Sequence, residues 1–253
     1  MISRARPLLG TIVSIRAQAK EEAVRAAFAA IEDVHGLMSA HSGHGDLAQI
    51  NQQAQRRAVR VHPWTFEVLR CARAVSEASA GAFDVTLRRV GASYRDIVLL
   101  SGKRVRLRRR AQLDLGGIAK GFAVDRAVEA LRRFGARSGS VNAGGDLRVF
   151  GETPQTVRVR LPGDPTLAAP VFTARERSFA TSGSYFGSVQ MDARTGSRLQ
   201  AGCSVTVCAP TCMLADALTK VVAALGPQPD LLKRFDAHAY LLDGNGRLYA
   251  ARG

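Results

Sequence analysis

The sequence predicts one α+β domain over residues 1–253, with helices flanking a mixed, mostly antiparallel sheet. Three observations predict this class. Apolar residues recur at helical spacing in several separated segments, and short strand patterns are grouped between them rather than alternating regularly with helices. The G-x-G-x-x-G turn that is typical of doubly wound folds is absent. The chain also shows no internal repeat and no low-complexity linker, which favours a single domain.

The individual elements follow from hydrophobic spacing. Apolar residues recur at helical spacing over residues 21–38 and 118–134, which predicts an amphipathic helix in each segment. Pro63 suits the first turn of a further helix that ends near Gly81, and Gly226 closes a helix over Leu214–Leu225. The expected extended segments are Thr11–Ile15, 104–115, Ser140–Asn142, Leu147–Phe150, Val157–Leu161, Ser204–Cys208 and a final hairpin around Asp243–Gly246.

Basic residues outnumber acidic residues, and the formal net charge is +15. The densest cluster, KRVRLRRR at 103–110, alternates Val105 and Leu107 with arginines, which predicts a strand with one solvated basic face. We rank this interpretation above nucleic-acid binding, because the chain shows no aromatic and basic interleaving. Only five of the 36 basic residues are lysines, and two of them, Lys120 and Lys220, lie inside the strongest motifs.

The sequence also bears on the compartment and on cysteine chemistry. No apolar stretch is long enough to span a membrane. The first residues show no signal peptide, so we expect a cytoplasmic protein as given, or a periplasmic one if an export signal was removed. Cys203, Cys208 and Cys212 follow a spacing that matches no common zinc site, and we expect these side chains and Cys71 to be small, partly buried groups.

The segment LDLGGIAKGFAVDRA, residues 113–127, is the first motif with chemical content. We expect a strand to end at Asp114-Leu115 and the glycines Gly116 and Gly117 to open a helix. Glycines allow a ligand to approach the backbone, and a helix N-terminus attracts anions. Lys120, one turn into the helix, could then reach a phosphate or a carbonyl. The alternative is a tight strand-to-helix connection without a ligand.

Three further segments permit close contact with a ligand. Gly144-Gly145 interrupt a strand pattern, which indicates either close backbone approach or a plain hairpin turn. Phe83 lies between small residues and Asp84, so it could stack on a ring, although a helix end followed by a strand explains the pattern equally well. The small hydroxyl residues Thr181-Ser182-Gly183 predict a turn that suits a ligand.

Asp216 lies on a predicted helix with Thr219 three residues later and Lys220 four residues later. Both positions neighbour Asp216 on a helix surface. A carboxylate and a hydroxyl together suit a hard cation such as Mg²⁺. The alternative is an Asp–Lys ion pair within the helix, which stabilises by only ~0.3–0.5 kcal/mol when exposed.

The order of these motifs resembles that of the ApbE family of FAD:protein FMN transferases. The resemblance covers nearly the whole chain, and its most specific part is DLGGIAKGFAVD. The matching segments are LGT at Leu9–Thr11, GAFDVT at Gly81–Thr86, DLGGIAKGFAVD at Asp114–Asp125, VNAGGDLR at Val141–Arg148, ATSG at Ala180–Gly183 and SVTVCAPTCMLADAL at Ser204–Leu218.

This resemblance implies the family's α+β fold, FAD as the bound substrate and Mg²⁺ at the pyrophosphate. It also implies transfer of FMN from FAD to a threonine or serine hydroxyl of an acceptor protein, with release of AMP. Carried over by position, the residues expected to contact FAD are Leu9, His41, Ala82, Phe83, Asp84, Asp114, Lys120, Thr181, Ser182, Gly183 and Met191. The expected metal ligands are Asp216, a backbone carbonyl at Gly117 and Thr219.

The chain departs from the family pattern at two chemically important positions. Val189 stands where the family has a histidine, which leaves Asp192 as the nearest candidate for the general base. Lys220 stands where the family has a threonine, and we expect it to pair with Asp216 and to weaken Mg²⁺ binding. Two related functions therefore stay open: a FAD-binding protein that has lost catalysis, and a pyrophosphatase that converts FAD to FMN and AMP.

Overall fold

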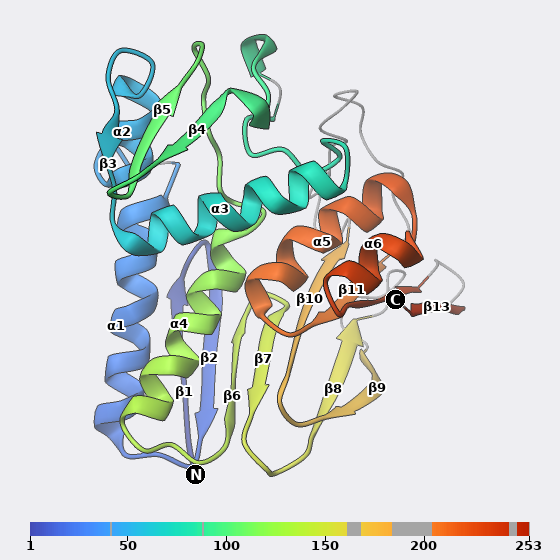
Figure 1. Ribbon diagram of the computed structural model, residues 1–253. Helices are drawn as coiled ribbons and strands as arrows, with labels where there is room; N and C mark the ends of the chain where they lie inside the picture. Colours follow the sequence, from blue (N-terminus) through green and yellow to red (C-terminus); the bar gives the residue numbers. More distant parts are fainter. Residues whose placement is uncertain (41, 88, 161–167, 184–203, 243–246, 253) are drawn as a thin grey trace.

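Helices pack on one face of a large, twisted antiparallel sheet in the computed structural model (Figure 1). The structure describes residues 1–252 except for 41, 88, 161–167, 184–203 and 243–246. The α-helices of these described residues are α1 (Glu21–Met38), α2 (Asp46–Gln53), α3 (Pro63–Ala78), α4 (Ala119–Arg133), α5 (Cys212–Leu225) and α6 (Pro229–Arg234). Two 3₁₀ turns, η1 (Arg89–Gly91) and η2 (Tyr94–Asp96), follow α3 in the chain.

The main sheet has eight strands in the described part of the chain, in the order β1-β2-β6-β7-β10-β11-β12-β13, and every pair is antiparallel. Its strands are β1 (Ile2–Leu8), β2 (Thr11–Ala17), β6 (Gly139–Ala143), β7 (Asp146–Phe150), β10 (Arg177–Gly183), β11 (Ser204–Ala209), β12 (His238–Leu242) and β13 (Leu248–Arg252). Alternation along β2 buries Val13 and Ile15 and leaves Ile12 and Ser14 on the opposite face. The sheet thus has one face that packs in the core and an opposite face that the helices leave open.

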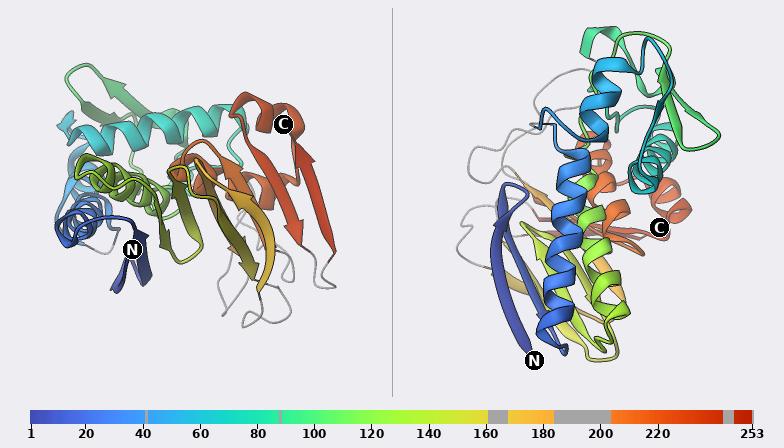
Figure 2. Two further views of the ribbon diagram at one scale, coloured as in Figure 1. Left: turned by 90° about the horizontal axis from the view of Figure 1, so that it is seen from below. Right: turned by 90° about the vertical axis from the view of Figure 1, so that its left-hand side faces the viewer.

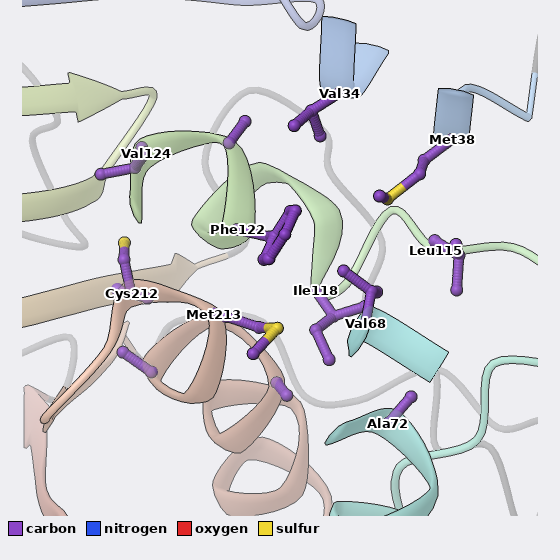
Figure 3. Close-up of a cluster of buried hydrophobic side chains, with 14 of the residues drawn as sticks. Val34, Met38, Val68, Ala72, Leu115, Ile118, Phe122, Val124, Cys212 and Met213 are labelled. Carbon is purple, nitrogen blue, oxygen red and sulfur yellow. The ribbon is translucent and has the colours of Figure 1, made fainter. Parts of the chain in front are cut away.

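The core lies between the helices and the buried face of this sheet. Figure 2 shows α1, α4 and α5 on the same side of the sheet, and α3 crosses them. In Figure 3, Phe122 of α4 lies among side chains of α1, α3 and α5, including Val34, Val68 and Met213. The Trp64 ring of α3 meets the edge of Phe122, with the ring centres 6.2 Å apart. These contacts fix α4 and α5 side by side, and both helices carry residues of the site described below.

Two smaller sheets complete the described structure. β3 (Val59–Arg60), β5 (Arg104–Leu107) and β4 (Ile97–Leu100) form one beyond α3. β8 (Gln155–Arg160) and β9 (Ala168–Ala174) form a ribbon. An apolar cluster of Val149, Val157, Ala174, Phe179 and Cys208 joins this ribbon to the open face of the main sheet. The ribbon therefore walls off part of that face.

The predicted α+β class is confirmed, and the helices expected over 21–38, 63–81, 118–134 and 214–225 are present as α1, α3, α4 and α5. Three local predictions are wrong. The extended segment expected over 104–115 ends at Leu107, so Asp114-Leu115 is not the end of a strand. The Thr181–Gly183 segment is the last part of β10, where it pairs with β11, and is not a turn. Lys120 is the second residue of α4, because the helix begins only at Ala119, after a turn.

Candidate functional site

A cleft of about 740 Å³ lies at the open face of the main sheet, a size typical of small-molecule sites. Its floor comes from β2, β6, β7 and β10, and β8 forms one side. The first turn of α4 contributes Lys120, and the middle of α5 contributes Lys220. The residues that line the cleft are Thr11, Ile12, Ser14, Gly116, Lys120, Asn142, Gly144, Gly145, Leu147, Val157, Arg158, Val159, Phe179, Thr181, Ser182, Gly183 and Lys220.

Two lysines and two aspartates meet at one wall of this cleft. Lys120 Nζ lies 2.5 Å from Asp146 Oδ2 and 3.7 Å from Asp216 Oδ2. Lys220 Nζ lies 3.1 Å from Asp216 Oδ1. Both carboxylates are buried, whereas both lysine side chains are about one-third exposed. The negative charges are thus covered and the positive charges face the cleft, which suits an anionic ligand.

Hydroxyl groups surround the ammonium of Lys220. Lys220 Nζ donates to Ser182 Oγ at 2.7 Å and to Thr219 Oγ1 at 2.9 Å. The two hydroxyls are themselves hydrogen bonded at 2.8 Å. The contact between Lys220 and Asp216 expected from the helix spacing is therefore present, and Ser182 joins it from β10.

A close approach of α4 and α5 holds Asp216 in place. A Cβ atom at Gly121 would lie 2.2 Å from the carbonyl oxygen of Cys212, so only glycine fits at this crossing. The Gly121 backbone N–H donates to Asp216 Oδ2 at 3.2 Å. A larger residue at position 121 would separate the two helices that carry the lysines.

Asp125 fixes the start of α5. Its carboxylate accepts hydrogen bonds from the backbone N–H groups of Cys212 at 3.0 Å and Met213 at 2.9 Å. The Arg148 guanidinium donates to the same carboxylate at 2.5 Å. Asp125 thus satisfies N–H groups at the first turn of α5 and ties that turn to α4 and β7.

The charges in the cluster perturb one another. Burial disfavours the charged form of Lys120, but the Asp216 and Asp146 carboxylates outweigh it and raise the pKa of Lys120. Burial likewise opposes ionisation of Asp216, but Lys120 and Lys220 outweigh it and hold the pKa of Asp216 below its ordinary range. Burial and the Asp216 carboxylate raise the pKa of Asp146 to about 6, although Lys120 and Lys220 oppose this shift.

This raised pKa predicts a pH-dependent stability. Asp146 binds a proton more tightly in the folded chain than in the unfolded chain, where its pKa is near 3.8. Its contribution to the free energy of unfolding should therefore fall as the pH rises from about 4 to about 6.

Urea unfolding of the wild type and of Asp146→Asn across this pH range tests the prediction. The difference between their free energies of unfolding should change with pH, and this change is due to position 146. The lowered pKa of Asp216 changes the free energy of unfolding only below pH 3.8, the ordinary pKa of this group, and so it does not contribute between pH 4 and pH 6. A difference that is flat or rises with pH would contradict the prediction.

The Gly144-Gly145 pair is a two-residue hairpin turn between β6 and β7, as the plainer alternative proposed. Both residues have positive φ, at 65° and 108°, which favours glycine. A Cβ atom at Gly144 would lie 2.6 Å from Thr11 Oγ1. The turn also lines the cleft, so close approach of a ligand to its backbone stays a prediction.

The structure brings some of the expected FAD contacts together and places others elsewhere. Lys120 and the Thr181–Gly183 strand end line the cleft. Leu9 lies in a neighbouring hollow of about 640 Å³, which shares Thr11 and Ile12 with the cleft. Asp114 accepts a hydrogen bond from the Gly116 N–H at 2.8 Å, at the turn before α4. The expected residues His41, Met191 and Asp192, as well as Val189, lie outside the described residues.

Ala82, Phe83 and Asp84 are buried and do not line the cleft. The Asp84 carboxylate accepts hydrogen bonds from the Thr86 backbone and hydroxyl, at 2.9 and 2.8 Å, and from the Tyr94 N–H at 3.0 Å. It therefore shapes the chain after α3. Phe83 lies next to Gly117, where its ring would be 3.5 Å from an added Cβ.

Asp125 and Asp146 lie within the sequence motifs, but the motifs by themselves assign neither of them a role. Asp125 directly follows the apolar residues Phe122–Val124 of α4, and a carboxylate beside such a stretch indicates an internal ion pair. Asp146 directly follows the Gly144-Gly145 turn, and a carboxylate beside this turn marked it as a candidate partner for a lysine of the motifs. Both signals were present in the sequence.

With Lys220 in its observed position, Asp216 and Thr219, two of the three expected metal ligands, do not fit a divalent cation. Asp216 and Thr219 lie together, and Thr219 Oγ1 donates to the Asp216 carbonyl at 2.7 Å. The Lys220 ammonium, however, already contacts the Asp216 carboxylate and the Thr219 hydroxyl. A divalent cation on these two oxygens would lie within a few ångströms of a fixed positive charge.

The structure is that of an α+β protein with a cleft lined by two lysines on the open face of its main sheet. A sequence model of the ApbE family matches residues 9–98 and 90–241. The chain belongs to the ApbE family, as the order of its motifs predicted.

Similar proteins include three that are named FAD:protein FMN transferase. One from Klebsiella pneumoniae is 26% identical over 206 residues, which are 70% of this chain and 65% of that protein. One from Haemophilus influenzae is 26% identical over 247 residues, 78% of this chain and 71% of that protein. One from Treponema pallidum is 29% identical over 234 residues, 72% of this chain and 64% of that protein. The chain thus spans about two thirds of the length of these relatives.

Solved structures show the same fold. The ApbE protein of Thermotoga maritima superposes with a TM-score of 0.85 at 24% identity, covering 99% of this chain and 96% of that one. The flavin transferase ApbE of Vibrio cholerae gives a TM-score of 0.83 at 20% identity, covering 99% of this chain and 96% of that one.

Among the described residues, no helix is both long and apolar enough to cross a membrane.

Proposed function

We propose that this protein is a FAD:protein FMN transferase, which moves FMN from FAD to a threonine or serine hydroxyl of an acceptor protein and releases AMP. One observation supports it most directly: Lys120 and Lys220 line the same wall of a cleft large enough for a dinucleotide. The names of the relatives supply the substrate class.

In the proposed reaction, the acceptor hydroxyl oxygen attacks the phosphorus on the FMN side of the pyrophosphate. A phosphorus–oxygen bond forms to the acceptor, the bond to the bridging oxygen breaks, and AMP leaves with that oxygen. The lysine charges would stabilise the negative charge that develops on the leaving phosphate. We propose Asp192 as the group that takes the hydroxyl proton.

This function predicts a preference among flavins. FAD should bind about tenfold more tightly than FMN or riboflavin, because an extended dinucleotide can contact the lysines and the Gly144-Gly145 turn together. Leu9 and Thr11 of the adjoining hollow would contact its far end. Calorimetric titration with each flavin measures the three affinities. Equal affinity for all three would contradict the proposal.

Mass spectrometry tests the reaction itself. The protein is incubated with FAD, with and without a threonine-containing acceptor protein. Transfer predicts AMP together with an acceptor whose mass has increased by one FMN less water. AMP and free FMN without any labelled acceptor would instead indicate a pyrophosphatase, and bound FAD without AMP would indicate a binding protein.

A further inference from the structure

We propose that the Lys220 ammonium occupies the position of the divalent cation, so that this protein binds its anionic substrate without a metal ion. The inference rests on the proposed function for the identity of the anion, FAD pyrophosphate. That the cation is a lysine ammonium and not a metal ion follows from the side chains at the wall of the cleft.

The first observation is that the ammonium fills the available donor set. A lysine ammonium carries three N–H donors. Lys220 places them on the Ser182 hydroxyl at 2.7 Å, the Thr219 hydroxyl at 2.9 Å and Asp216 Oδ1 at 3.1 Å. A hydroxyl, a second hydroxyl and a carboxylate oxygen are the oxygens that a hard cation would use. The lysine therefore satisfies the groups that would otherwise attract a metal.

The second observation is that the other oxygen of Asp216 is also engaged. Asp216 Oδ2 accepts the Gly121 N–H at 3.2 Å and lies 3.7 Å from Lys120 Nζ. A divalent cation at this carboxylate would thus be flanked by two ammonium groups. Asp216 and Asp146 together balance the two lysine charges, so no net negative charge is left in this cluster to hold a further cation.

The third observation is that packing holds Lys220 in this position. The Cγ and Cε atoms of Lys220 lie 3.5 Å from the point where a Cβ atom of residue 117 would stand if Gly117 carried one. The aliphatic part of the lysine side chain therefore runs along the turn before α4. The side chain is 30% exposed, and it lines the cleft next to Gly116 and Lys120. The same charge that excludes the metal therefore lies where the pyrophosphate would bind.

Manganese binding tests this inference, because Mn²⁺ is detected by electron paramagnetic resonance without any turnover. Wild-type protein, Lys220→Thr and Lys220→Gln are titrated with Mn²⁺ in the absence of flavin. We expect the affinity for Mn²⁺ to rise about tenfold in Lys220→Thr, which replaces the ammonium by a hydroxyl, and less in Lys220→Gln. Lys233→Thr on α6 removes the same charge from an exposed site and should bind Mn²⁺ as the wild type does.

The wild type supplies a second measurement that needs no folded variant. Its affinity for FAD should be the same within about twofold in EDTA and in excess Mg²⁺. Tight Mn²⁺ binding to the wild type, or FAD binding that requires Mg²⁺, would overturn the inference. Absence of FAD binding under both conditions would overturn the proposed function, while the Mn²⁺ titrations would still decide the role of Lys220.

Discussion

Replacement of Asp125 by alanine is expected to lower the free energy of unfolding by about 3–5 kcal/mol, as is typical when one partner of a buried ion pair is removed. The side chain of Asp125 is only 3% exposed and that of Arg148 only 16%. The change leaves the guanidinium without its partner and two N–H groups at the start of α5 without an acceptor. Urea unfolding followed by circular dichroism measures the effect.

Two variants control this experiment. Asp125→Asn keeps an oxygen acceptor but loses the charge, so its cost should lie between the wild type and Asp125→Ala. Asp33→Ala removes an exposed carboxylate from helix α1, and the free energy of unfolding should change by about 0.5 kcal/mol or less. A cost below about 1 kcal/mol for Asp125→Ala would show that Asp125 does not hold α5 to α4 and β7.

Replacement of Lys120 by alanine is expected to weaken FAD binding tenfold or more. A charge-assisted hydrogen bond contributes roughly 1.5–3 kcal/mol, and Lys120 is one of the two lysines that line the cleft. The change should also raise the pKa of Asp146, since Lys120 is the main group that lowers it. Fluorescence titration with FAD measures the affinity, and Lys233→Ala on the surface of α6 is the matched control.

The double variant Lys120→Ala, Asp146→Asn separates binding from folding. It removes the buried carboxylate that Lys120 neutralises, so it should recover stability lost in Lys120→Ala. It restores no cation to the cleft, so FAD affinity should stay low. Recovery of affinity together with stability would assign Lys120 a structural role only.

The sequence alone determined the fold class, the four long helices and the family. These features depend on local information: the hydrophobic period over 21–38 or 118–134, and the ordered motifs such as DLGGIAKGFAVD. The same local reasoning identified Lys120 and Lys220 and predicted that Lys220 would pair with Asp216, because residues four apart share one face of a helix.

Only the tertiary structure decided what these side chains do together. Lys120 is 26 residues from Asp146, and Lys220 is 38 residues from Ser182, so no spacing along the chain could bring them into contact. Local sequence predicts a turn over Thr181–Gly183, but pairing with β11 holds this segment in a strand. Strand pairing and the crossing of α4 and α5 at Gly121 arise from contacts between distant segments. Such contacts, rather than local propensity, placed two ammonium groups and two buried carboxylates at one wall of the cleft.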